Sequence, residues 1–326
     1  MCRGIHKRLR AILAGKGDSL PDVRRTGHNL SYRLRDALIC AFCIFFFQHP
    51  SALAFQRQMQ EKRRRNNIAS IFGVGEIPSD TQIKTLLDRI EPDAFGGAFD
   101  ESLRVAEARG ALDSYRVLDG GVLIALDGVW YHQSENISCK RCLHVRKGDR
   151  TTYYHTILAA TMVKPGDTVV LPVMGEPIGN EGGCEKQDCE RNAAKRWLSK
   201  HAGEYARLKP TLLGDDLFSC QPICEAVLSC GLSFIFTCKP QSHPWLTETV
   251  GNSVPGEKTR REWNGRHHVS WRWQWLNGVE LRDSPDALKV NYVCLEITNG
   301  KTGKTIFRNG WVTDKAVTED NVALIA

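Results

Sequence analysis

The sequence predicts an α/β fold in which helices pack on a mixed sheet. From residue 120, short apolar runs of strand length alternate with segments of helical periodicity, which is the pattern of helices packed on a sheet. Before that point the periodicity is mostly helical, and after residue 254 strand-like runs are separated by turn pairs such as Asn277–Gly278. We therefore expect an N-terminal helical region, a mixed sheet flanked by helices, and a β-rich insertion.

The positive charge of the chain is concentrated near its start. Residues 1–65 contain 14 Lys or Arg and 4 Asp or Glu, a net charge of +10, and because the whole chain carries +7, the remaining residues carry −3. A segregated positive region suits a polyanion such as DNA, although a solvated basic surface would have the same composition. The charge distribution alone is thus compatible with DNA as the partner and equally with a solvated surface.

No segment is expected to enter a membrane. The longest apolar run, Leu38 to Phe47, is well short of the ~20 residues that a bilayer requires and is preceded by too many charges for a secretory signal. We interpret it as a core helix and expect a cytoplasmic protein with reduced cysteines. Five cysteines in apolar stretches are expected to behave as small buried hydrophobes; they are Cys40, Cys43, Cys230, Cys238 and Cys294.

The first third of the chain is interpreted as a DNA-binding part. Residues 1–30 are basic with little periodicity, which predicts a flexible arm, and residues 31–115 predict a helical region. Within it, Ser79 or Asp80 is expected to cap a helix that carries Ile83 and Leu86 on one face. Basic side chains of this region are expected to contact phosphates; they are Arg57, Lys62, Arg63, Arg64 and Arg65.

Carboxylates follow two of the predicted strands. Val122 to Leu126 is an apolar run followed by Asp127, and Thr211 to Leu213 is followed by Asp215 and Asp216. Carboxylates at the ends of adjacent buried strands are rigid, meet at one edge of the sheet and suit Mg²⁺, the ion that assists phosphoryl transfer. Either aspartate would also suit a strand-end turn.

These segments resemble a known family. Leu123-Ile-Ala-Leu-Asp-Gly-Val-Trp130 is similar to the first-aspartate motif of insertion-sequence DDE transposases, and Leu212-Leu-Gly-Asp-Asp-Leu-Phe218 is similar to their second. Lys186-Gln-Asp-Cys-Glu190, between them, also resembles one branch of that family.

The resemblance implies a ribonuclease-H-like catalytic domain at residues 116–254 and a β-strand insertion at residues 255–316. It implies Mg²⁺ or Mn²⁺ bound by Asp127 and Asp215, with Asp216 as the alternative second acid. The implied activity is cleavage and joining of transposon-end and target DNA. The resemblance is also compatible with a homodimer in the DNA complex. A nuclease of the same fold and a non-catalytic DNA-binding remnant of a transposase are the alternatives.

The family also has a third acid, a glutamate on a helix that follows the insertion. Residues 317–326 resemble only the start of that segment, and Glu319 is the one late substitute, with Asp320 beside it. The resemblance therefore implies a C-terminally truncated transposase that is inactive by itself, because one of the metal-binding carboxylates is missing.

Two further patterns predict sites. Cys139-Lys-Arg-Cys142 is half of a tetrahedral zinc site, for which Cys189 and His155 are the first candidates as remaining ligands and Cys184 or His144 are the alternates; free thiols are the other interpretation. Rings at alternate positions share one face of a predicted strand; they are Trp271, Trp273 and Trp275. They predict either the core of the insertion or a ring that stacks on an unpaired DNA base.

Overall fold

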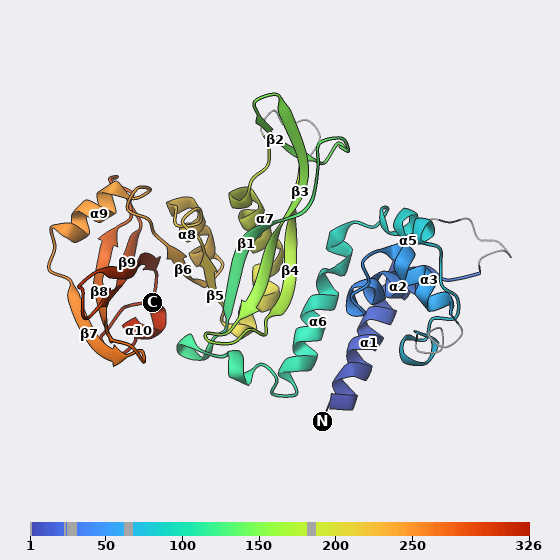
Figure 1. Cartoon of the computed structure of the whole chain (residues 1–326), viewed down its shortest axis with the longest axis horizontal. Helices are drawn as coiled ribbons and strands as arrows, with labels where there is room; N and C mark the ends of the chain where they lie inside the picture. The colour runs from blue at the N-terminus through green and yellow to red at the C-terminus, as the bar shows by residue number, and fades with distance from the viewer. Residues whose placement is uncertain (1, 23, 25–30, 62–67, 181–186) are drawn as a thin grey trace. The chain divides into compact units, whose positions relative to one another are not determined.

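The computed structural model describes residues 2–22, 24, 31–61, 68–180 and 187–326, and it divides the chain into two compact units (Figure 1). The first unit spans Met1–Leu112 and the second spans Asp113–Ala326. Among the described residues, no helix is both long and apolar enough to cross a membrane. The helical region is predicted at residues 31–115, whereas the first unit also includes the residues before it; the sheet lies wholly in the second unit.

The first unit is helical. Its α-helices are α1 (Cys2–Ser19), α2 (Leu34–Phe46), α3 (Ala52–Gln60), α5 (Asp80–Leu87) and α6 (Gly96–Glu107). Ser79 caps α5 through a capping box with Gln82, as the sequence predicts. The predicted flexible arm is wrong for residues 2–19, which form α1. Leu9, Ile12 and Leu13 recur at helical spacing, and Leu13 packs against the core beside α2.

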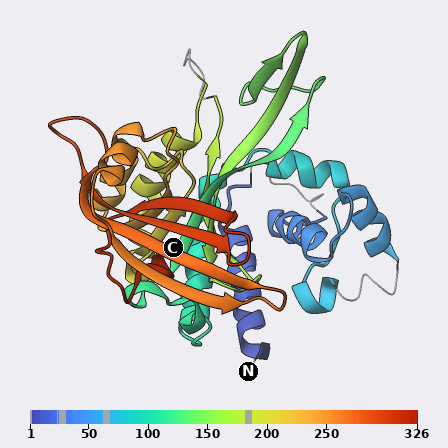
Figure 2. The same ribbon diagram turned by 60° about the vertical axis from the view of Figure 1, so that its left-hand side comes forward.

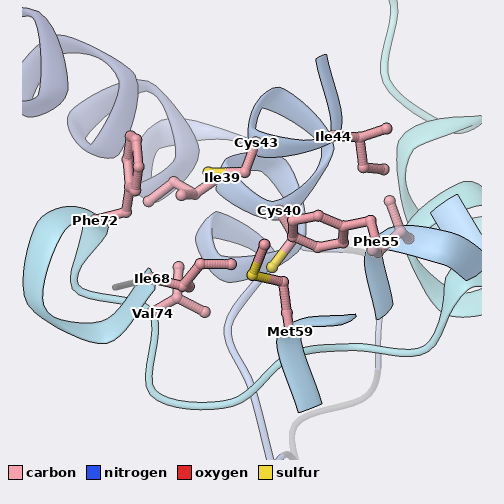
Figure 3. Packing of buried hydrophobic residues seen from close by; sticks show 10 residues of the cluster. Ile39, Cys40, Cys43, Ile44, Phe55, Met59, Ile68, Phe72 and Val74 are labelled. Atoms are coloured by element: carbon pink, nitrogen blue, oxygen red, sulfur yellow. The ribbon is translucent and has the colours of Figure 1, made fainter. Parts of the chain in front are cut away.

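The core of the first unit forms around α2 (Figure 3). Cys40 and Cys43 of α2 are fully buried and pack with Phe55 and Met59 of α3. Burial raises the pKa of both thiols to about 12, so they remain neutral and act as small hydrophobes, as predicted. The opposite face of α2 is exposed, as the Phe45 side chain with 81% of its surface accessible shows. The apolar run that the sequence predicts as a core helix therefore has one buried face and one face exposed to solvent.

The second unit is built on one ten-stranded sheet. Its strands are β1 (Leu123–Ser134), β2 (Leu143–Lys147), β3 (Arg150–Val163), β4 (Leu171–Ile178), β5 (Thr211–Gly214), β6 (Ser233–Thr237), β7 (Gly256–Trp263), β8 (His268–Glu280), β9 (Lys289–Asn299) and β10 (Thr305–Thr313). The order is β2-β3-β1-β5-β6-β10-β9-β8-β7, and β4 also pairs with β3. The pairs β1–β5 and β5–β6 are parallel, and the other pairs are antiparallel. The predicted mixed α/β class is confirmed.

Three of these strands form an arm, defined here as residues 129–156. β1 runs past its predicted end at Leu126 to Ser134 and stays paired with β3, while β2 pairs with the first residues of β3. In Figures 1 and 2 this hairpin extends from the rest of the sheet. Most side chains of the outer half of β1 are exposed, so the buried run that ends at Leu126 does not extend into the arm.

Helix α7 (Glu190–Tyr205) packs on β4. One face of the helix is buried, with an apolar set at helical spacing; its members are Ala193, Ala194, Trp197 and Leu198. The Trp197 indole donates a hydrogen bond to the Met174 carbonyl at 2.6 Å, and the Met174 N–H donates to the Tyr205 hydroxyl at 3.1 Å. Two aromatic side chains thereby fix α7 against one residue of β4. Shorter helices follow as α8 (Gln221–Ser229), α9 (Pro244–Gly251) and α10 (Val322–Ile325).

The predicted β insertion extends the main sheet. β10 pairs with β6, so β7 to β10 continue the same sheet (Figure 2). The last residues of the chain return to the start of β1, since Val317 and Val322 pack in one cluster with Leu118 and Leu123. The chain end thus lies beside the N-terminal end of β1.

Candidate functional site

The two predicted catalytic aspartates lie at matching positions along two neighbouring parallel strands, Asp127 within β1 and Asp215 directly after β5. Ala125 of β1 pairs with Leu213 of β5, and Asp127 and Asp215 each lie two residues further along. Because β1 and β5 are adjacent strands about 4.8 Å apart, the two residues lie near one another where β5 ends, although β1 continues past Asp127 in its pairing with β3. Both side chains are exposed, and the one described hydrogen bond to either carboxylate runs from the Leu217 N–H to Asp215 at 2.9 Å. Most of their acceptor capacity is therefore open to a ligand.

A third carboxylate, Glu190, faces this edge. Glu190 is the first residue of α7, and its pKa is raised by burial and then by the negative charges of Asp215 and Asp127. Its carboxylate also lies against Gly128, where an added Cβ would come 2.1 Å from Oε1. Glu190 ends one of the family-like segments, but no local pattern marks it as a site residue, because only the docking of α7 brings it to the sheet.

Ion pairs fix the start of α7. Arg196 contacts the buried Glu176 of β4 at 2.8 Å and Asp188 at 2.7 Å, and Lys200 reaches Glu176 at 3.1 Å. Burial opposes ionisation of Asp188, but the hydrogen bonds from Arg196 prevail and lower its pKa. A paired Glu176 and Asp188 hold β4 and the α7 N-terminus together, so Glu190 is presented from a rigid support.

Asp216, the alternative acid, is occupied by a loop. Its carboxylate accepts hydrogen bonds from the Lys239 N–H at 2.6 Å and from the Ser242 hydroxyl at 2.5 Å, and His243 lies 3.8 Å away. These contacts tie the segment after β6 to the end of β5. The geometry favours Asp215 over Asp216 as the residue with a carboxylate available to a ligand.

The acids are near one another but are not gathered around one point. Among the described residues, the group of three potential ligand atoms that lie within 4.8 Å of one another consists of Cys139, Cys142 and His155, so the three carboxylates are more widely spread. Like charges repel, and each carboxylate is more stable at a distance from the others until a cation neutralises them. Side-chain rotation would be needed for all three to bind one ion.

Glu319, the late substitute, lies elsewhere. It follows Val317, which packs with Leu123 at the N-terminal end of β1, whereas Asp127 is at the other end of the apolar part of that strand. The Glu319 carbonyl accepts a hydrogen bond from Lys258 of β7 at 2.7 Å. The structure therefore does not bring Glu319 to the two aspartates, because β10 runs antiparallel to β6 and delivers the chain to the opposite edge.

The predicted cysteine and histidine ligands converge in part. The Cys139 and Cys142 sulfurs are 3.6 Å apart, and His155 Nε2 lies 3.3 Å from the first and 3.4 Å from the second. Cys189 is exposed and outside this group, so the geometry does not support it as a fourth ligand. Cys189 directly precedes Glu190, whose side chain lies against Gly128 of β1. The residue of β1 that pairs with His155 is His132, four residues or ~13 Å further along the strand.

The alternate ligands have different outcomes. His144 is exposed, its backbone is held by Gln187 through hydrogen bonds of 2.7 and 3.0 Å, and its ring lies against Tyr153 rather than His155. Cys184 lies outside the described residues. His132, which sequence reasoning misses, is the cross-strand partner of His155, and their ring centroids are 6.0 Å apart.

The residues predicted to contact DNA are divided by the structure. Arg57 is exposed in the last turn of α3, and the run Lys62 to Arg65 lies outside the described residues. Trp273 is 4% exposed and packs with Val293 and Leu295, and Trp271 and Trp275 pack against the same cluster. The stacking role is wrong for Trp273, because its ring is inside the core that the other interpretation predicts.

The arm carries exposed groups that sequence reasoning also misses. Between Ser138 and Arg150 there are five Lys or Arg and one Asp. Lys147 and Arg150 are exposed at the tip, and the half-exposed Trp130 stacks on Tyr154 with ring centroids 3.9 Å apart. Cations interleaved with aromatic rings suit a nucleic-acid strand. The net charge of the chain does not reveal this cluster, because the basic excess lies in residues 1–65 and the remaining residues carry a net negative charge.

No family model matches the chain, and no curated protein matches its sequence.

Proposed function

We propose that this chain acts in DNA transposition as a DDE-type transposase that cleaves and joins DNA with the help of Mg²⁺ or Mn²⁺. The observation that carries the proposal is the matching register of Asp127 and Asp215 on adjacent parallel strands, with the Glu190 carboxylate in the electrostatic field of both. Three carboxylates on rigid elements are a donor set that suits Mg²⁺, which prefers oxygen ligands.

The sheet order supports a ribonuclease-H-like assignment for residues 116–254. β1 is central, with antiparallel β3 and then β4 on one side and parallel β5 and β6 on the other, and α7 covers β4. In this arrangement the strands that bear the two aspartates are neighbours, as the expected metal site requires.

In the proposed reaction, the protein binds and orients DNA, and divalent metal supplies activation of the attacking oxygen and stabilisation of the leaving oxygen. Asp127 and Asp215 would hold the metal, and Glu190 would be the third acid. Arg196 acts as a positioning residue, because its contacts with Glu176 and Asp188 fix the start of α7. The cations of the arm would bind DNA phosphates.

The test uses the purified chain, Mg²⁺ or Mn²⁺, and a plasmid carrying the DNA that flanks its gene. Without the late glutamate the resemblance implies an inactive chain, whereas a third acid supplied by Glu190 would make the chain active by itself. On the second basis we expect cut ends and joined products that are lost in Asp127→Asn and in Asp215→Asn. The matched control is Asp283→Asn, at an exposed aspartate in the turn between β8 and β9, which should retain activity. Cleavage without joining would favour the nuclease, and DNA binding without cleavage would favour a non-catalytic DNA-binding protein.

Cleavage that survives both aspartate substitutions would contradict the proposal. Asp216→Asn provides a second comparison, since it alters a carboxylate that holds a loop. It should reduce the melting temperature more than Asp215→Asn does, whereas Asp215→Asn should have the larger effect on metal-dependent cleavage.

A further inference from the structure

The base of the turn between β1 and β2 contains two thiols and an imidazole in contact with one another. Cys139 and Cys142 come from the turn, and His155 comes from β3. The turn is shaped around the sulfurs, because the Cys139 N–H donates a hydrogen bond to the Cys142 sulfur at 3.2 Å and the Cys142 N–H donates to the Cys139 carbonyl at 3.1 Å. Asn180 also donates to the Cys142 carbonyl at 3.0 Å.

The spacing of the three ligand atoms matches a tetrahedral zinc site. Zn–S bonds of about 2.3 Å and Zn–N bonds of about 2.0 Å at tetrahedral angles place two sulfurs about 3.8 Å apart and a sulfur and a nitrogen about 3.5 Å apart. The corresponding distances here are 3.6 Å between the sulfurs and 3.3 and 3.4 Å from the sulfurs to His155 Nε2. One ion would therefore reach all three atoms with little movement.

A β-bulge brings a candidate fourth ligand to this group. Trp130 pairs with Thr156 and His132 pairs with His155, so Tyr131 is an extra residue on β1. The bulge places two rings beside His155: Tyr131 stacks at 5.7 Å between centroids, and His132 lies at 6.0 Å with an interplanar angle of 40°. His132 is exposed, so its ring is able to turn toward the sulfurs without disturbing a core.

We propose that Cys139, Cys142, His155 and His132 bind a structural zinc ion at the base of this turn. A closed site with four protein ligands leaves no position for substrate, so its role is to hold the fold. The ion would cross-link β1, the turn and β3, and would thereby fix the cationic tip formed by β2 and the start of β3. The arm is otherwise supported mainly by strand pairing, since most of its side chains are exposed.

The test measures zinc in the full chain, purified under a thiol-free reductant so that the two cysteines stay reduced. We expect one zinc ion per chain, and loss of it in Cys142→Ser. Cys230→Ser, at a half-buried cysteine after α8, is the matched control and should keep the ion. Absence of stoichiometric zinc in the reduced wild-type chain would overturn the site.

Cobalt substitution tests the fourth ligand. We expect a tetrahedral Co²⁺ spectrum with the thiolate absorption of two sulfurs. Loss of a residue that only supports a ligand already weakens metal affinity about tenfold or more, so loss of the ligand itself in His132→Gln should weaken it at least about tenfold. His144→Gln, on the neighbouring strand β2, should leave affinity unchanged. Absorption of three thiolates, or an unchanged affinity in His132→Gln, would overturn the assignment of His132.

Hydrogen exchange provides a readout of the structural role. Chelation of the ion should accelerate amide exchange at residues 135–150 and leave β5 and β6 unchanged. Equal exchange in the arm with and without the ion would overturn the claim that it holds the arm. None of these measurements requires DNA cleavage, so failure of the zinc site and failure of the proposed transposase activity are distinguishable.

Discussion

The carboxylate of Glu190 lies directly against Gly128, the residue that follows Asp127. A Cβ added to Gly128 would come 2.1 Å from Oε1 and 2.4 Å from Cδ of Glu190. The absence of a side chain at Gly128 therefore leaves the space in which the first residue of α7 reaches the edge of the sheet.

Gly128→Ala should displace the Glu190 carboxylate while preserving the fold, because the clash is with the end of a flexible side chain. We expect weaker Mn²⁺ binding by titration calorimetry and little change in melting temperature. Gly203→Ala is the control, since nothing lies within 4 Å of its added Cβ and alanine favours a helix by roughly 0.5–1 kcal/mol. Equal Mn²⁺ affinity in Gly128→Ala and the wild type would mean that the Glu190 carboxylate does not contribute to metal binding.

Glu190→Gln should have opposite effects on stability and on metal binding. Burial and the charges of Asp215 and Asp127 raise the pKa of Glu190, so its protonated form is favoured in the folded chain. Ionisation then costs stability as the pH rises above the ordinary value of a glutamate. We expect Glu190→Gln to raise the metal-free melting temperature at pH 7, with a gain that disappears near pH 4, and to weaken Mn²⁺ binding.

Glu248→Gln is the matched control for that measurement, since Glu248 is an exposed glutamate in α9. It should change neither property. A lower melting temperature for metal-free Glu190→Gln at pH 7 would mean that contacts of the glutamate, rather than charge repulsion, dominate its effect on stability.

The sequence predicts those features that depend on local pattern. The apolar runs Val122 to Leu126 and Thr211 to Leu213 correspond to the buried part of β1 and to β5, and the predicted cap at Ser79 begins α5. The outer half of β1, with β2 and β7, is not predicted, because exposed strands have no apolar alternation and exist only through pairing with a partner.

Tertiary contacts account for what sequence reasoning misses at the sites. The proximity of Asp127 and Asp215 is predictable because strand ends share an edge. Glu190 joins them only because Trp197 and Arg196 dock α7 on β4, and His132 faces His155 only because of a bulge. Neither a docking angle nor a bulge has a local sequence signal here, so the sequence favours Cys189 where the structure offers His132.

Trp273 should contribute to stability rather than to DNA binding. It is buried with Val293 and Leu295, so Trp273→Ala should cost about 3–5 kcal/mol of unfolding free energy in a denaturant titration. Trp273→Phe should cost less, because no hydrogen-bond partner for the buried indole N–H exists among the described residues. A folded Trp273→Phe chain with much weaker DNA binding would restore the stacking interpretation.

The arm should contact DNA phosphates through Lys147 and Arg150, which are exposed at its tip. Removal of one phosphate contact lowers the slope of log affinity against log salt by about 0.9. The double variant Lys147→Gln/Arg150→Gln should therefore reduce that slope by roughly 2 for any duplex sequence, because phosphate contacts carry no sequence information. Lys301→Gln, at an exposed lysine in the turn between β9 and β10, should leave the slope unchanged.

Arg57→Gln in α3 should reduce the slope of log affinity against log salt by about 0.9 if the helical unit also binds DNA. An unchanged slope in the double variant, beside a reduced slope in Arg57→Gln, would restrict the DNA contacts to the helical unit and exclude the tip of the arm.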